Sequence, residues 1–182
     1  MHSREGAQAM RESSYTAVIV EMTVRALWET QNTIDCIPDE LWDKLYGGMP
    51  LWQYLYHTLH KLDQWFIDPG DPGFIEPPIH TPGLDALDAP PPVRLTRRDV
   101  EDYFAAIKAR LSLYLTSLHD EDLLQRPENC PWTRFTLILS QYRCLHRQIG
   151  LLMGLILAET GLRPKTLDLG RELPDPPYDP YE

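Results

Sequence analysis

The sequence predicts an all-α protein built as a four-helix bundle with one long crossover connection. Four segments carry apolar residues at helical spacing, and proline and glycine separate these segments from one another. No segment shows a convincing strand pattern, and no internal repeat is present. The 182 residues fit one domain with a full hydrophobic core. Together these observations indicate helices packed on helices.

The first two long helices are expected to be joined by a short connection. Helical spacing of apolar residues covers roughly 13–34, and DELWDKLYGG (39–48) reads as one short helical turn that ends at its two glycines. The second helix begins near Pro50, where proline is tolerated, and ends before DPGDPG (68–73). A short connection is typical of antiparallel neighbours.

The next connection is long and rich in proline, from residue 68 to residue 96. A connection of this length suits a crossover between parallel helices, and such loops often carry function. Thr96 is the expected N-cap of the third helix, with Asp99 three residues later in a variant of the capping box. After this helix, DEDLLQRP (120–127) predicts one further turn.

The last helix is expected over 132–159, and it stops at Gly161. The chain therefore divides into a flexible N-terminus (1–12), the bundle (13–162) and an acidic, proline-rich tail (163–182). Low hydrophobicity and high proline content predict a tail that is disordered or laid along the surface.

Composition excludes several classes of partner. Lys+Arg 17 against Asp+Glu 27 gives a net charge of −10, without a compensating basic stripe, so nucleic acid and anionic membrane are poor partners. No apolar stretch of about 18 residues is present, and the first residues lack the apolar core of a secretion signal. Cys36, Cys130 and Cys144 show no CxxC spacing, which argues against a disulfide framework. We expect a cytoplasmic protein.

Three stretches carry a resemblance to a known family. LWQYLYHTLHKLDQWFIDP, EPPIHTPGLDALD and SQYRCLHRQIGLL resemble the DinB-like four-helix bundles, most specifically at HTLHKLDQWF, and the order of elements agrees over residues 13–160. The resemblance implies a divalent metal held by three histidines, one on the second helix and two spaced by four on the last. Some members of that family are metal-dependent thiol transferases that use bacillithiol or mycothiol, and many have no assigned reaction.

Carried over residue by residue, the family pattern places its metal ligands at His57, Cys144 and Gln148. Two of the three expected histidines are therefore replaced. Cys144 and Gln148 are four residues apart and share a helix face, whereas His146 lies about 200° round from Cys144. We expect the three side chains to converge in one cavity between the second and last helices.

This ligand set predicts a degenerate metal site. His57 and Cys144 are good ligands for zinc, and the neutral amide of Gln148 is a weak one. We expect no tightly bound zinc or nickel in the cavity, and gain of metal in a Gln148→His variant. The alternatives are a divalent metal retained on the same residues, or a hydrogen-bonded pair of His57 and Gln148 with Cys144 as a small apolar residue.

Further residues near this cavity are candidates for its lining. His60 is close to the face of His57, Tyr56 is a candidate pocket residue, and Arg143 would either hold an anionic group or pair with a surface acid. His80 on the crossover would cap the pocket mouth or belong to a surface loop. Asp63 is expected on the solvated side of its helix or bound to a loop backbone group.

Three functions from different classes remain open at the level of sequence. The first is a DinB-like protein with a degenerate metal site that binds a small molecule or serves as a stress-related scaffold. The second is an active metal-dependent thiol transferase, and the third is a dimeric interaction scaffold. The catalytic residues, the substrate and the thiol do not follow from the residues.

Overall fold

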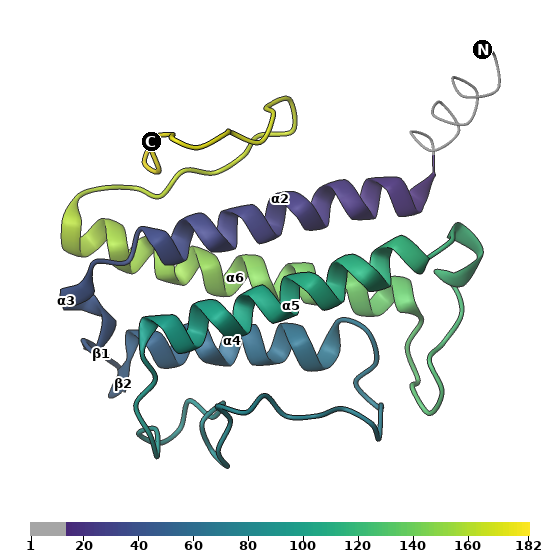
Figure 1. The fold of residues 1–182 in the computed structure, drawn as a ribbon, viewed down its shortest axis with the longest axis horizontal. Coiled ribbons are helices and arrows are strands. Elements are labelled where there is room, and N and C mark those ends of the chain that lie inside the picture. The colour runs from purple at the N-terminus through teal and green to yellow at the C-terminus, as the bar shows by residue number, and fades with distance from the viewer. Residues whose placement is uncertain (1–13) are drawn as a thin grey trace.

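The computed structural model describes residues 14–182, and within them α-helix dominates. Four long helices lie side by side (Figure 1), which confirms the predicted all-α class. They are α2 (Tyr15–Asp35), α4 (Leu51–Trp65), α5 (Arg97–Ser117) and α6 (Arg134–Thr160). The N-terminus (1–12), expected to be flexible, lies outside the described residues. No helix in the described part of the chain is long and apolar enough to cross a membrane.

Short elements fill the first connection, and here the sequence prediction was incomplete. One turn of helix, α3 (Asp39–Trp42), is followed by an antiparallel hairpin of two strands, β1 (Leu45–Tyr46) and β2 (Met49–Pro50). Gly47 and Gly48 make the turn of this hairpin, with φ values of 57° and 93°. Such a two-residue turn needs positive φ at both positions, which glycine adopts without strain. The two glycines therefore reverse the chain instead of ending a helix.

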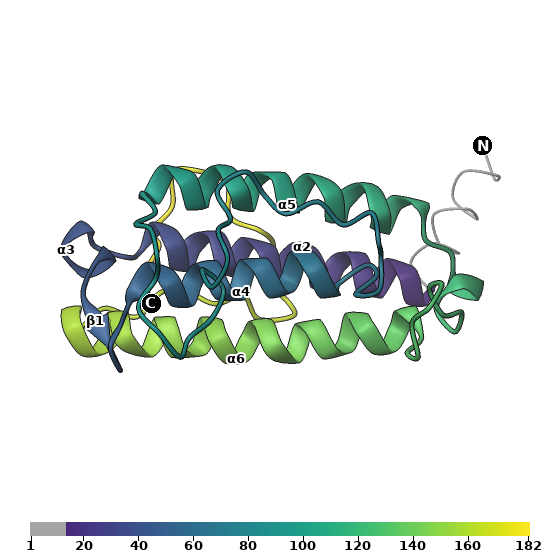
Figure 2. The same cartoon turned by 90° about the horizontal axis from the view of Figure 1, so that it is seen from below.

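The helix directions agree with the connection lengths. Figures 1 and 2 show α2 and α4 running in opposite directions, whereas α4 and α5 run the same way. Between α4 and α5 the crossover (66–96) returns along the bundle without regular secondary structure. The predicted capping box is present, because Thr96 Oγ1 accepts from the Asp99 amide and the Asp99 carboxylate accepts from the Thr96 amide. A short 3-10 turn, η1 (Asp120–Asp122), precedes α6.

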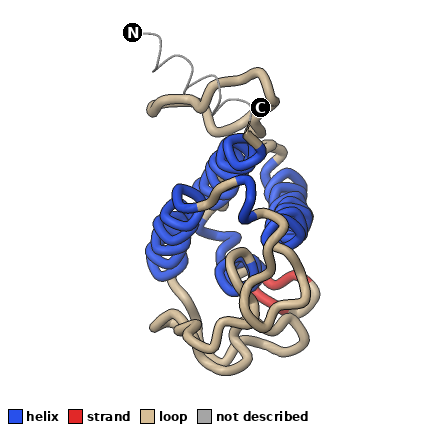
Figure 3. Tube along the Cα trace, turned by 90° about the vertical axis from the view of Figure 1, so that its right-hand side faces the viewer, coloured by secondary structure: helices blue, strands red, loops and turns tan. Residues whose placement is uncertain are grey.

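Helix α4 is packed on two sides. It contacts α6 on one side and α5 on the other, and Figure 3 shows the arrangement of the helices from one end. Trp52, Leu55, Tyr56 and Leu59 of α4 are buried almost completely. The crossover covers a further part of α4, since Gln53 Nε2 donates to the Ala86 carbonyl at 2.7 Å. Polar side chains of α4 are therefore placed toward α6, toward the crossover or, at Asp63, toward α5.

The C-terminal segment (163–182) is laid along the surface, which was one of the two arrangements expected for it. Asn32 of α2 is fully buried, and its side-chain amide donates to the carbonyls of Lys165 and Pro180 at 3.1 and 3.0 Å. The ring centroids of Trp28 and Tyr178 lie 5.4 Å apart. These contacts dock the segment on α2, above the helices in the view of Figure 1.

Candidate functional site: a cavity between α4 and α6

A cavity of about 260 Å³ lies between α4 and α6. His57 from α4 and both Cys144 and Gln148 from α6 line it, so the structure brings together the three residues of the expected metal site. Cys144 and Gln148 lie one helical turn apart and are both partly buried. Helix spacing on α6 and packing of α4 against α6 are sufficient to create this convergence.

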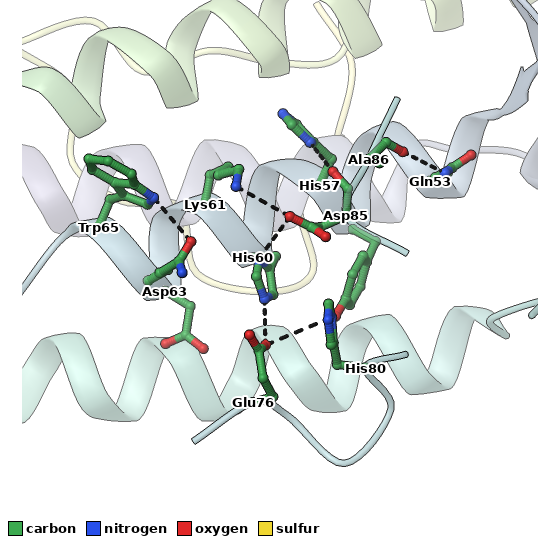
Figure 4. A network of polar contacts seen from close by, with 12 residues as sticks. Gln53, His57, His60, Lys61, Asp63, Trp65, Glu76, His80, Asp85 and Ala86 are labelled. Carbon is green, nitrogen blue, oxygen red and sulfur yellow. Dashed lines mark hydrogen bonds and ion pairs between the residues drawn. The ribbon is translucent and has the colours of Figure 1, made fainter. Parts of the chain in front are cut away.

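His57 is held by the crossover and not by Gln148. Its Nδ1 lies 2.6 Å from the backbone carbonyl oxygen of Asp85. A carbonyl only accepts, so Nδ1 carries a proton, and in the neutral imidazole the lone pair is on Nε2. Figure 4 shows the ring pointing away from the other polar residues of α4 and the crossover. Among the described residues no hydrogen bond joins His57 to Gln148, so the alternative of a hydrogen-bonded pair is not formed.

The cavity carries two cationic side chains, Lys61 and Arg147, and no carboxylate is among its lining residues. The Lys61 ammonium is shared with the crossover, because Nζ lies 3.2 Å from Asp85 Oδ2. Arg147 forms no ion pair with any residue of the described chain, 14–182. In a protein with a net charge of −10, this cavity has the opposite local charge.

The structure does not place the other three predicted pocket residues in this cavity. Arg143 is exposed and is not among the residues that line it. Tyr56 and His60 are buried on the side of α4 that faces the crossover. Arg147, and not Arg143, is the arginine that lines the cavity.

His60 belongs to a second polar cluster, between α4 and the crossover (Figure 4). Its Nε2 lies 2.6 Å from Glu76 Oε2, and its ring centroid lies 4.8 Å from that of His80. His80 Nδ1 lies 2.8 Å from the Tyr56 hydroxyl. His80 is therefore a largely buried partner of α4 instead of a surface-loop residue. Glu76 was missed, because a proline-rich loop has no periodicity that predicts which side chains point inward.

Asp63 is also buried, contrary to its expected place on the solvated side. The Tyr103 hydroxyl donates to Asp63 Oδ2 at 2.8 Å, and the Arg110 guanidinium pairs with the same carboxylate. Helix α5 supplies both partners and covers this face of α4, which the sequence of α4 alone does not reveal. Burial raises the pKa of the Asp63 carboxyl above its usual range, although Tyr103 and Arg110 act in the opposite direction.

The cavity residues do not fit a complete transition-metal site. His57 Nε2 is available as a ligand, and Cys144 supplies a sulfur after it loses a proton. Gln148 offers a neutral amide oxygen, which suits zinc or nickel poorly and adds no negative charge. Two good donors fall short of the three or four that a stable site uses.

Comparisons with known proteins identify no relative: no protein-family model, no curated protein and no solved structure matches the chain.

Proposed function

We propose that the chain is a DinB-like four-helix bundle with a degenerate metal site, and that its α4–α6 cavity binds a small organic anion. The two cationic side chains of the cavity carry this proposal, above all Arg147, which forms no ion pair in the described part of the chain. A carboxylate, sulfonate or phosphate group would form charge-assisted hydrogen bonds with the guanidinium.

The remaining lining indicates the shape of the ligand. Leu62, Trp65 and Leu145 supply apolar contact, and Ser140 and Gln141 supply hydrogen-bonding groups. The cavity volume of about 260 Å³ is small beside typical ligand pockets of roughly 300–1,000 Å³. The ligand class that fits is therefore a compact molecule with one acidic group and a short aliphatic or aromatic body. His57 Nε2 would accept a hydrogen bond from it.

The test is ligand binding by matched arginine variants. A panel of small aliphatic and aromatic carboxylates, with the corresponding amides, is screened by protein-observed NMR, and hits are measured by titration calorimetry. We expect carboxylates to bind and to shift the resonances of His57 and Cys144. Arg147→Gln should raise the Kd by about tenfold, corresponding to one lost charge-assisted hydrogen bond.

Arg143→Gln is the control, because it removes the same charge from the same helix outside the cavity. It should raise the Kd clearly less than Arg147→Gln does, because the exposed Arg143 side chain does not line the cavity and cannot bond the ligand directly. Amides that bind as well as the carboxylates, equal effects of the two arginine variants, or no hit near His57 would each contradict the proposal.

One observation favours a second function, that of a metal-dependent thiol transferase. Cys144 is partly exposed in the cavity that His57 also lines, so a soft ligand and an imidazole are directed to one space. If this reading is right, the parent protein holds metal in the cavity as purified. Our account predicts that it does not, and that Gln148→His, which restores a third good ligand, gains near-stoichiometric zinc or nickel.

Elemental analysis of untagged parent and Gln148→His protein distinguishes the degenerate metal site from the metal-dependent thiol transferase. Cys144→Ser in the Gln148→His background locates the metal. If this double variant loses the metal, the Cys144 thiol is one of the ligands. Near-stoichiometric metal in the parent that Cys144→Ser removes would overturn the degenerate site and support the transferase.

A further inference from the structure

The cluster of His60, Glu76 and His80 is separate from the α4–α6 cavity and has the composition of a metal site. His60 is 2% exposed, and one nitrogen of each histidine and one carboxylate oxygen of Glu76 all lie within 4.8 Å of one another. Glu76 Oε2 is central, because it lies 2.6 Å from His60 Nε2 and 3.8 Å from His80 Nδ1. Figure 4 shows the Glu76 carboxylate in contact with both imidazoles. None of these three residues lines the cavity of the proposed function.

The second nitrogen of His60 gives an independent indication. His60 Nδ1 is buried without a hydrogen-bond partner and lies 3.7 Å from Asp85 Oδ2. A neutral imidazole has one N–H, so a proton on Nε2 for Glu76 leaves the Nδ1 lone pair facing a carboxylate. The same carboxylate oxygen lies 3.2 Å from the Lys61 ammonium, so Asp85 is placed as an ion-pairing group beside this nitrogen.

A cation bound at His60 Nε2 removes this conflict. The imidazole proton then belongs on Nδ1, where it points toward Asp85. A ligating histidine that gives its other N–H to a carboxylate is the usual outer shell of protein metal sites. The unpartnered nitrogen, Asp85 and the three ligand atoms thus form one consistent arrangement.

We propose that His60, Glu76 and His80 bind a divalent transition metal of the zinc class. Two imidazoles and one carboxylate with open coordination positions suit zinc or cobalt better than calcium or magnesium, which prefer oxygen ligands. Metal binding displaces the His60–Glu76 hydrogen bond and the Tyr56 hydroxyl from His80 Nδ1. We therefore expect a site that loads reversibly with added metal and is empty after chelation.

An entry path and a structural consequence follow from the position of the ligands. The Glu76 side chain is 46% exposed and lines a cavity of about 500 Å³ between the crossover and α5, so an ion from solvent would meet this ligand first. His60 belongs to α4, whereas Glu76 and His80 belong to the crossover. The bound metal joins the two segments and, because it binds the folded state, raises the Tm.

The experiment is a titration of the chelator-treated full chain with Co²⁺ alone, followed by visible and near-ultraviolet absorption, with Zn²⁺ competition and Tm as further readouts. The proposal predicts one equivalent of Co²⁺ with d–d bands and without a thiolate charge-transfer band, since no cysteine is a ligand. Zn²⁺ should displace it and raise the Tm.

Variants assign the ion to its ligands. Glu76→Gln is close in shape and partly exposed, so it tests ligation without loss of the fold, and His80→Gln removes a second ligand. Both should abolish the one-equivalent step, and Asp85→Asn should weaken binding by about 10–100-fold. Cys144→Ser and His146→Gln, an exposed histidine on α6, should leave the titration unchanged.

Three results would overturn the proposal. The first is no saturable Co²⁺ binding, which would leave His60 as an imidazolium between Glu76 and Asp85. The second is a thiolate band that Cys144→Ser removes, which would place the ion in the α4–α6 cavity. The third is binding that Glu76→Gln and His80→Gln leave intact, which indicates adventitious surface histidines.

Discussion

Asp85 of the crossover contacts polar side chains on two sides of α4, with its backbone carbonyl and with its carboxylate. Its backbone carbonyl accepts from His57 Nδ1, and its carboxylate pairs with Lys61 and faces His60 Nδ1. One crossover residue thereby fixes the tautomer of His57, shares the charge of Lys61 and completes the surroundings of His60. The orientation of the polar side chains of α4 thus depends on a loop residue 24 or more positions later.

The pH dependence of stability tests whether burial or ion pairing governs the pKa of the Asp63 carboxyl. Because burial raises the pKa of its carboxyl in the folded protein, the folded state binds the proton more tightly than the unfolded state. The contribution of Asp63 to stability is therefore full below the unfolded pKa of about 3.9 and is lost as pH rises through the folded pKa. The free energy of unfolding of the parent minus that of Asp63→Asn should increase as pH falls from about 7 to about 4.

Urea denaturation of both proteins across this pH range measures the difference. Asp88→Asn, which neutralises an exposed carboxylate of the crossover, corrects for the change in net charge. A difference that shrinks with acid would show that Tyr103 and Arg110 outweigh burial, so that the folded pKa lies below the usual range.

At the scale of elements, helix α5 begins at an N-cap that the sequence predicts. Thr96 Oγ1 and the Asp99 carboxylate satisfy each other's backbone amides at the start of the helix. Thr96→Ala should lower the free energy of unfolding by about 0.5–2 kcal/mol, measured by urea denaturation. Thr116→Ala, exposed near the end of the same helix, should cost less than about 0.5 kcal/mol. Equal losses in the two variants would contradict the role of the cap.

The helices and the crossover differ in how far sequence predicts them. Apolar spacing, the Thr96 cap and Gly161 locate the four long helices within a few residues, because these signals are local. The position of His57 opposite Cys144 and Gln148 follows from a resemblance and from helix spacing, and the structure brings the three together. Contacts of the crossover depend on tertiary packing, so neither the Glu76–His60 bond nor the burial of His80 was predicted.

For the whole molecule, the acidic surface and the cationic cavity have opposite effects on an anion. A net charge of −10 repels anions from the protein as a whole, whereas Lys61 and Arg147 attract them into one place. The proposed function requires the local effect to prevail. A dimeric scaffold stays a prediction of the sequence, and light scattering of the full chain tests it.

Alkylation of Cys144 measures the charge preference of the cavity directly. Cys36 and Cys130 are buried, and burial raises the pKa of the Cys36 thiol to about 11, so Cys144 is the thiol best placed to react. Iodoacetate and iodoacetamide are nearly equal in size and differ in charge. The ratio of their rates at Cys144, obtained by peptide mass spectrometry and divided by the ratio for a free cysteine derivative, reports the local potential.

Our account predicts a normalised ratio above unity in the parent, by about two- to fivefold, as expected for a partly exposed charge worth under about 1 kcal/mol. Arg147→Gln should lower the iodoacetate rate and leave the iodoacetamide rate unchanged, and Arg143→Gln, outside the cavity, should lower the iodoacetate rate less. A normalised ratio below unity that is the same in the parent and in both variants would contradict the account, because the acidic surface would then govern the cavity.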